Sequence, residues 1–341
     1  MTLQGPAAWE AEAEREHVHG LGPWKLGLRR LRRNRVALFF GALFVVLVVS
    51  CAAAPVWANR VAKTGVNDNH LSDTITVDGK EKNVVGLDGV PIGPQWWKAD
   101  GKFFLGADRN GRDIMVRLLY GGRNSLEIGI LAAVITTIFS IILGVVAGYF
   151  RGVPDAVIRS LLDILWSFPV IILGVALGVA LALGGLKIGP LKLAGDSLVI
   201  PIFIIGLVYV PYMARPVRGQ VLSLREKEFV EAARAQGAGP TRIMFTEVMP
   251  NLSSTVIVFF TLLIANAILL EAALSFLGAG VQPPNPSWGT MIQDGVSRIA
   301  TAAHLAVVPG IMLVLTVLSL NVFGDGVRDA LDPRAKVRLE R

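Results

Sequence analysis

Six stretches of this chain run for 18 to 26 residues without a single aspartate, glutamate, lysine or arginine. They are residues 36–59, 128–150, 164–186, 197–214, 248–270 and 299–324. A helix rises about 1.5 Å per residue, so about 20 apolar residues cross the hydrocarbon layer of a membrane. The composition agrees, because only 17% of all residues are charged, against roughly 25% in soluble domains. The sequence therefore predicts an all-α integral membrane protein with six transmembrane helices.

The first stretch has to be compared with a secretory signal, because Val49-Ser50-Cys51 resembles a lipoprotein cleavage site. The basic region before it is 35 residues long, and the apolar run exceeds the roughly 7–15 residues of a signal core. We therefore assign residues 36–58 to a first transmembrane helix. Cys51 is the only cysteine, so the chain cannot form an internal disulfide or a thiolate metal cluster. We expect Cys51 to be a small buried apolar residue.

The basic residues are arranged by membrane topology. The net charge of +7 gathers in "WKLGLRRLRRNR", directly before the first apolar stretch, where positive charge marks the cytoplasmic side and meets anionic membrane lipid. No aromatic residues alternate with these cations in the manner of an RNA-binding segment, so no nucleic-acid partner is predicted. Six crossings then return the chain to its starting side, which places both termini in the cytoplasm.

These assignments divide the chain into five parts. They are a basic cytoplasmic N-terminus (1–35), the first transmembrane helix (36–58), an extracytoplasmic loop (59–125), a core with transmembrane helices two to six (126–325) and a cytoplasmic tail (326–341). In the loop, "TITVDGKEKNVV" predicts a β-hairpin that turns at Asp78-Gly79. The spacing of Ile114, Leu118 and Leu119 predicts a separate amphipathic helix on the membrane surface.

Glycines and prolines punctuate the predicted spans. Gly144 and Gly148 are spaced four residues apart, as are Gly174 and Gly178, and this spacing lets helix backbones approach closely in lipid. Four prolines lie inside or near the ends of spans, where they kink or start helices: Pro169, Pro201, Pro211 and Pro309. A bundle with so many interruptions is better suited to movement than to passive anchoring.

One charged stretch, "EFVEAARAQGAGPTRIMFTEVMPN", interrupts the apolar runs at residues 228–251. It predicts a helix over residues 223–236, a left-handed stop at Gly237, and a second short helix that starts at Pro240. Small alanines and an apolar face suit docking onto a partner protein. The alternative is a solvated loop with a chance amphipathic pattern.

The order Glu231-Ala232-Ala233-x-x-x-Gly237, followed by Pro250, resembles the cytoplasmic "EAA" loop of permease subunits in bacterial ATP-binding-cassette importers. Longer segments narrow the resemblance to the second permease of dipeptide and oligopeptide importers, whose close relatives serve nickel and glutathione importers. These segments are "LGADRNGRDIMVRLLYGGRNSL", "GYFRGVPDAVIRSLLDILWSFP", "EAALSFLGAGVQPPNPSWGTMIQDG" and "FGDGVRDALDPR". Two departures stand out: Met249 replaces the usual leucine, and residues 60–104 do not match the common pattern.

The resemblance implies the type I importer permease fold, half of a translocation pore, and a place in the bacterial cytoplasmic membrane. It implies as partners a homologous second permease, two cytoplasmic ATPases and an extracytoplasmic solute-binding protein. The loop 217–250 would seat on the ATPases through the coupling residues Glu231, Ala232, Ala233, Gly237 and Pro250. The chain has no Gly-x-x-x-x-Gly-Lys-[Ser/Thr] phosphate cradle, so ATP and magnesium are expected on the partners and no catalysis on this chain.

Two acidic residues at membrane depth, Asp163 and Glu271, are candidates for the substrate path, since such charges face a cavity or a partner. Glu271 could meet the ammonium of a peptide, or it could hydrogen-bond to the following turn, "GVQPPNPSW"; the second interpretation is favoured. For Asp163 an ion pair with Arg159 or with a neighbour at the cytoplasmic end is expected.

Other functional classes fit less well. A secondary transporter calls for broken helices and buried charges in matching halves, and no such repeat is visible. An intramembrane enzyme needs a paired acid or a nucleophile with its base, but the four histidines lie apart, at positions 17, 19, 70 and 304. "DRNGRD" lacks the alternating acids of a calcium loop, so no metal site is predicted. A membrane scaffold stays possible, and the choice among dipeptide, oligopeptide, nickel complex and glutathione stays open.

Overall fold

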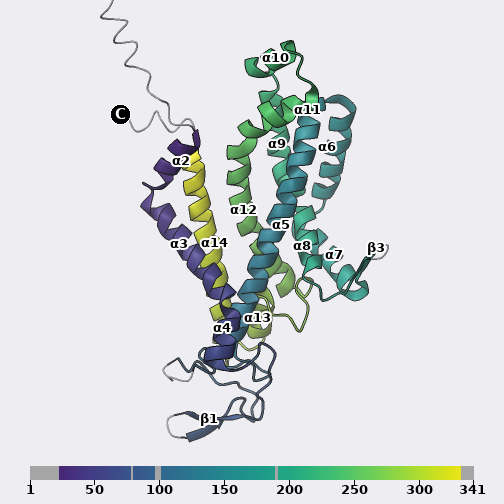
Figure 1. The fold of residues 1–341 in the computed structure, drawn as a ribbon. Helices are drawn as coiled ribbons and strands as arrows, with labels where there is room; N and C mark the ends of the chain where they lie inside the picture. The colour runs from purple at the N-terminus through teal and green to yellow at the C-terminus, as the bar shows by residue number, and fades with distance from the viewer. Residues whose placement is uncertain (1–22, 78–79, 97–100, 189–190, 332–341) are drawn as a thin grey trace, which may run out of the picture.

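The computed structural model describes residues 23–77, 80–96, 101–188 and 191–331 as a long helical bundle with two small hairpins (Figure 1). The N-terminal part contains α2 (Pro23–Leu31), α3 (Arg35–Ala52), α4 (Ala54–Val56), the π-helix η1 (Trp57–Ala62), β1 (Thr74–Val77) and β2 (Lys80–Asn83). The middle part contains α5 (Ile114–Phe150), α6 (Gly152–Ser167), α7 (Val170–Gly184), β3 (Leu186–Ile188), β4 (Leu191–Leu193), α8 (Val199–Val208) and α9 (Val210–Leu224). The last part contains α10 (Glu228–Ala235), α11 (Pro240–Ile243), the π-helix η2 (Met244–Val248), α12 (Met249–Phe276), α13 (Trp288–Val296) and α14 (His304–Leu331).

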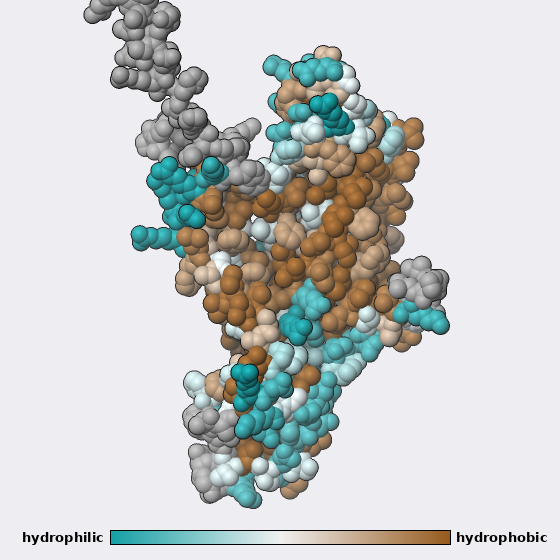
Figure 2. Space-filling view, viewed as in Figure 1, coloured by the Kyte–Doolittle hydropathy of each residue, from teal (hydrophilic) through white to brown (hydrophobic). Residues whose placement is uncertain are grey.

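Up to six membrane crossings lie within the described ranges. Four are helices that are long and apolar enough alone: α3, α5, α14, and the continuous stretch Pro240–Phe276. Two are bent pairs, α6 with α7 at 85° and α8 with α9 at 40°, and counting each pair as one span gives the predicted six. Figure 2 shows apolar side chains forming a broad belt between hydrophilic ends on the face in view. This belt is what a membrane-embedded bundle presents to lipid.

The separate amphipathic helix expected before the second span is wrong. Ile114 instead begins a single helix of 37 residues, α5. Ile114, Leu118 and Leu119 are buried in the bundle rather than lying on a membrane surface. The reason is that Arg117, which gave this segment its polar face, is also buried and donates a 3.1 Å hydrogen bond to the Asn67 side chain. Asn67 belongs to the region between η1 and α5, residues 63–113, which is called the extramembrane lobe below.

Helix α5 forms the centre of the bundle, and its glycines bring α9 close. A Cβ added at Gly144 would lie 2.7 Å from the Val217 side chain, and one at Gly148 would lie 2.7 Å from Val221. Gly178 of α7 packs even more closely, because its Cβ would lie 2.1 Å from the carbonyl oxygen of Ala279. The close approach predicted from glycine spacing is therefore confirmed.

Two hydroxyls of α5 hold the break between α8 and α9. Thr136 donates a 2.8 Å hydrogen bond to the carbonyl of Gly206, and Ser140 donates a 2.9 Å bond to the carbonyl of Val210. A break inside a membrane frees backbone groups that lipid cannot satisfy. Thr136 thus gives the Gly206 carbonyl, which lies next to the break, a hydrogen-bond partner.

The two ends of the bundle are formed by different parts of the chain. Helix α2, the projection formed by α10, and the last turn of α14 lie at one end of the bundle, while the β1 hairpin lies at the other (Figure 1). The predicted hairpin is confirmed: β1 and β2 pair antiparallel, although the Asp78-Gly79 turn itself lies outside the described residues. Cys51 is fully buried, as expected.

The extramembrane lobe is tied to α5 by Asp113, which caps that helix. The Asp113 carboxylate accepts backbone hydrogen bonds from Val116 at 3.0 Å and from Phe103 at 2.6 Å. Burial raises the pKa of Asp113 above its ordinary value, and the backbone hydrogen bonds work against that rise. The cap therefore fixes the start of α5 against the loop that precedes it.

Candidate functional site

The charged stretch forms a two-helix projection, defined here as residues 228–248, at one end of the bundle (Figure 1). Helix α10 stops at Gly237, which has a φ of +83°. Gly237 donates its N–H to Arg234 and Ala238 donates its N–H to Ala233, at 2.9 and 3.0 Å. These bonds satisfy carbonyls that the helix end would leave free. The left-handed stop and the restart at Pro240 are both confirmed.

The helix boundaries of the projection differ from those expected. The first helix begins at Glu228 rather than at residue 223, because α9 runs on to Leu224 and a short turn follows. The second helix is not separate, since the chain is helical without interruption from Pro240 to Phe276. The π-helix η2 directly precedes the first turn of α12, where Pro250 lacks the N–H that a regular α-helix would use. The second part of the projection, from Pro240 onward, is therefore an extension of α12.

The projection is anchored on one side and exposed on the other. Val230 is fully buried and Ala233 packs against the main core. The Arg234 guanidinium lies 6.0 Å from the centre of the Tyr149 ring. The exposed side chains of the projection include Glu228, Phe229, Glu231, Ala232, Arg234, Ala235, Arg242 and Phe245. Phe245, which no motif singled out, is 67% exposed. A buried support thus holds charged and aromatic side chains on the exposed face of the projection.

Ion pairs connect α6 to α9 beside the projection. Arg218 of α9 makes two hydrogen bonds to Asp155 of α6, one of them 2.7 Å long. Arg151, directly before α6, pairs with Glu226, which follows α9. Asp163 pairs with Arg215 of α9 at 2.7 Å. Of the two partners expected for Asp163, Arg159 is therefore not the one that the structure shows.

Glu271 lies near the C-terminal end of α12 and is fully buried. Its Oε1 accepts a 2.6 Å hydrogen bond from the Ser275 hydroxyl, which in turn accepts the backbone N–H of Val281. Glu271 is thus connected to the "GVQPPNPSW" turn through Ser275. The Ser125 and Ser287 side chains also lie near this carboxylate, although among the described residues its second oxygen, Oε2, makes no hydrogen bond of regular geometry.

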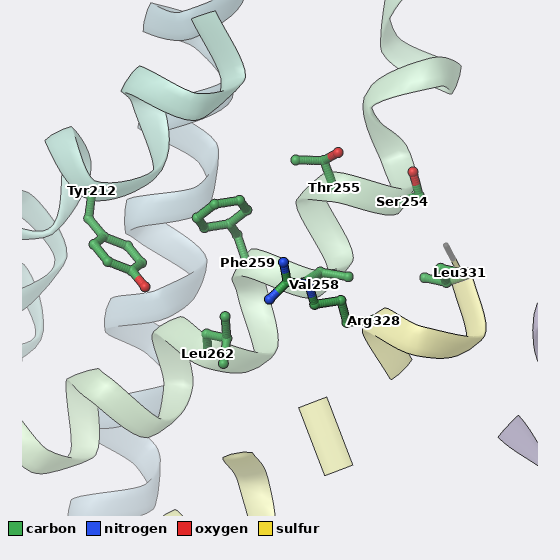
Figure 3. A pocket seen from close by; sticks show the side chains of 8 residues that line it. All are labelled: Tyr212, Ser254, Thr255, Val258, Phe259, Leu262, Arg328 and Leu331. Atoms are coloured by element: carbon green, nitrogen blue, oxygen red, sulfur yellow. The ribbon is translucent and has the colours of Figure 1, made fainter. Parts of the chain in front are cut away.

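A third feature, the inner groove, opens between α9, α12 and α14 and has a volume of about 450 Å³ (Figure 3). Its lining residues are Tyr212, Ser254, Thr255, Val258, Phe259, Leu262, Arg328 and Leu331. No motif pointed to this groove, because its three walls come from distant parts of the chain. Its one sequence signal is an arginine in the last turn of the sixth span.

Acid–base groups elsewhere in the described ranges do not form a metal centre: no three His, Cys, Asp or Glu side chains there could share an ion. His70 does lie between Thr64, at 2.7 Å, and Asp73, at 2.8 Å. This order resembles that of a nucleophile, base and acid, but Thr64 is only 6% exposed. We interpret this hydrogen-bond chain as structural.

Most of the chain matches known protein families and relatives. A family model described as "binding-protein-dependent transport system inner membrane component" matches residues 140–337, and one for the N-terminal transmembrane domain of oligopeptide transport permease C matches residues 22–71. A glutathione transport system permease protein of Pectobacterium atrosepticum is 34% identical, over 92% of each chain. A dipeptide transport system permease protein of Alkalihalophilus pseudofirmus is 34% identical, over 93% of this chain and 91% of its own. A di/tripeptide transport system permease protein of Pseudomonas aeruginosa is 35% identical, over 87% and 88%.

A solved structure supports the fold alone. An inward-facing conformation of the MetNI methionine ABC transporter contains a chain that is 19% identical, with a TM-score of 0.53. The match covers 64% of this chain and 98% of that one. The fold is therefore the type I ABC importer permease fold that the sequence predicted. Taken with the family models and the relatives, this establishes that the chain belongs to the family of inner-membrane permease components of binding-protein-dependent ABC transport systems.

Proposed function

We propose that this chain is one of two homologous permease subunits that together form the pore of an ATP-driven importer of short peptides. The relatives are named for dipeptides, for di- and tripeptides and for glutathione, and these substrates share peptide bonds and free carboxylates. Peptide import is the function that this shared chemistry favours. Glutathione or a nickel complex is the alternative within the same family.

The proposed complex also contains two cytoplasmic ATPases and an extracytoplasmic solute-binding protein. ATP and magnesium would be bound by the ATPases. The basic helix α2 and the projection lie at the same end of the bundle (Figure 1), and positive charge favours the cytoplasmic side. This supports cytoplasmic termini, with residues 1–35 and 326–341 inside and the loop 59–125 outside. The membrane segments would be 36–58 and the five spans of 126–325.

The projection is the observation that carries the proposal. It connects to α9 through a short turn and to α12 without a break, so a force on its exposed face reaches two spans at once. Glu231 and Ala232 are exposed for contact, while Ala233, Gly237 and Pro250 shape and support the unit. We assign these five residues, within the loop 217–250, to coupling with the ATPases.

The two acids at membrane depth take different roles in this proposal. Glu271 is fully enclosed and bound to Ser275, which supports a structural role. The Asp163 side chain is 58% exposed in its pair with Arg215. A charged pair at membrane depth avoids lipid, so Asp163 is the better candidate to face the partner permease or the substrate path.

Cysteine cross-linking tests the coupling role. We expect Glu231→Cys and Ala235→Cys to cross-link to an ATPase subunit, with yields that change when ATP is bound. The native Cys51 is buried and does not compete. Val230→Cys, at a buried position of the same helix, and Arg32→Cys, at an exposed position near α2, are the matched controls. A yield at Glu231 and Ala235 that is no higher than at the controls, or that is independent of nucleotide, contradicts the coupling role.

A further inference from the structure

The inner groove contains polar groups that the protein itself does not use. The hydroxyls of Tyr212, Ser254 and Thr255 line it, and none of them makes a hydrogen bond to any described residue. Hydroxyls on a helix usually bond back to a carbonyl of the preceding turn. Ser253 and Thr261, on the same helix, do so with Pro250 and Val258. The groove hydroxyls are therefore available to a ligand or to water.

One cation, Arg328, lies at this groove. Arg328 of α14 extends toward Val258 and Phe259 of α12 (Figure 3). Among the described residues it takes part in no ion pair or hydrogen bond, although Asp325 and Asp329 are close in sequence. A guanidinium presents a planar fork of donors that matches a carboxylate. The groove thus offers one anion-binding group beside several neutral hydroxyls.

Tyrosine side chains extend from the groove toward the interior of the bundle. The Tyr212 ring contacts Phe259 and Tyr209 with centroid distances of 5.9 and 6.2 Å. The Tyr209 hydroxyl donates to the carbonyl of Asn266, at 3.3 Å. Polar side chains inside membrane helices face the bundle interior or a water-filled cavity. A lipid tail in this groove would leave the Ser254 and Thr255 hydroxyls unsatisfied in hydrocarbon, which is costly.

We propose that the inner groove is part of the substrate path, and that Arg328 binds the carboxylate of a short peptide there. This inference rests on the proposed function. The volume of about 450 Å³ lies within the range of pockets for small ligands. The hydroxyls of Tyr212, Ser254 and Thr255 can hydrogen-bond the peptide backbone, and the ring of Phe259 supplies an apolar wall.

The test compares two probes that differ only at the carboxylate: dialanine as the free acid and dialanine amide. Uptake is measured in proteoliposomes that contain the whole complex and saturating binding protein. Each variant rate is divided by the wild-type rate for the same probe, which cancels the preference of the binding protein. We expect Arg328→Gln to slow the free acid about tenfold, as the loss of a charge-assisted bond predicts, and the amide less than about twofold.

Conservative and distant variants serve as controls. Arg328→Lys keeps the charge and is expected to retain most uptake of the free acid. Arg32→Gln removes an exposed cation at the same end of the bundle, outside the groove, and should change neither probe. Equal slowing of both probes by Arg328→Gln, or no slowing of either, overturns the inference. If the wild-type complex carries neither probe, the proposed function itself fails.

Two further measurements test the inference without relying on uptake by Arg328→Gln alone. Ser254→Cys places a thiol in the groove without altering Arg328, and its labelling by a maleimide during turnover should slow at least about threefold with the free acid and not with the amide. Equal labelling rates overturn the inference even if Arg328→Gln does not assemble. Uptake is also repeated in phosphatidylcholine vesicles with and without phosphatidylglycerol. A defect that affects both probes and appears only with the anionic lipid assigns Arg328 to a headgroup and overturns the inference.

Discussion

Ser275 and Glu271 form a buried pair one turn apart on α12, with the Ser275 hydroxyl donating a 2.6 Å hydrogen bond to the glutamate. The same hydroxyl accepts the backbone N–H of Val281 at 3.0 Å. Close packing encloses the pair, since a Cβ added at Gly280 would lie 2.3 Å from the Ser275 oxygen. The turn after α12 is therefore fixed to the helix through side-chain hydrogen bonds that lipid and water do not reach.

Replacement of Glu271 tests this structural role. Glu271→Gln keeps an oxygen that can accept the Ser275 hydroxyl, so we expect near-normal peptide uptake at normal expression. Glu271→Leu leaves that hydroxyl without its acceptor, and should lower the free energy of unfolding by about 1–3 kcal/mol. Uptake and unfolding in detergent are the measurements. Loss of uptake in a stable, fully assembled Glu271→Gln complex would instead favour a direct role in transport.

Gly237 is expected to be essential for the shape of the projection. Its φ of +83° costs other residues roughly 1–2 kcal/mol, so Gly237→Ala should distort the turn after α10. We expect the ATPase stimulation produced by loaded binding protein to fall severalfold. Gly219→Ala is the control, because Gly219 lies in α9 with open space around its Cβ position and alanine favours a helix. Equal stimulation in both variants would show that the turn is not needed for coupling.

The ion pairs in and directly beside α6 and α9 should differ in strength according to their burial. The side chains of Arg218 and Asp155 are 24% and 12% exposed, and removal of one partner leaves a poorly solvated charge. We expect Asp155→Asn to cost about 2 kcal/mol of unfolding free energy. Exposed pairs contribute about 0–1 kcal/mol, and Arg151 and Glu226 are of that kind. Double-mutant cycles on both pairs check the ranking, which fails if the exposed pair couples as strongly.

Glycine packing between α7 and the turn after α12 gives a further prediction. Gly178→Ala would place a methyl group 2.1 Å from the Ala279 carbonyl oxygen, so the helix has to move. Overpacking of this kind costs roughly 1–3 kcal/mol. Gly310→Ala, at a helical glycine with nothing within 4 Å, should be neutral or stabilising. Thermal unfolding of the two variants measures the contrast, and similar midpoints would contradict it.

The number of crossings followed from the sequence because long uncharged runs have one stable solution in lipid. Their geometry did not follow. The 85° bend between α6 and α7 occurs at the predicted breaker Pro169, but its size depends on packing against distant helices. The full length of α5 was hidden because Arg117 reads as a surface residue, and only the extramembrane lobe supplies the partners that bury it.

The projection was the most predictable part of the candidate site, since Gly237 and Pro240 act through local backbone chemistry alone. Its buried and exposed faces were less predictable, because Val230 and Phe245 acquire their environments only when the bundle forms. The inner groove could not be predicted for the same reason: Tyr212, Ser254 and Arg328 come from three helices, and no short motif joins them.

The break at Tyr209 divides the fourth span into two arms, α8 and α9, and the Thr136 and Ser140 hydroxyls of α5 bond to one carbonyl on each side of it. The inner arm, α9, carries the ion pairs and leads into the projection, whereas the outer arm, α8, packs with its own apolar cluster against α7. In the proposed importer, a displacement of the projection would act first on the inner arm, which leads into it, while the outer arm keeps its own contacts with α7. The proposed importer needs such a separation, because its pore would open toward the cell interior while its opposite end stays closed.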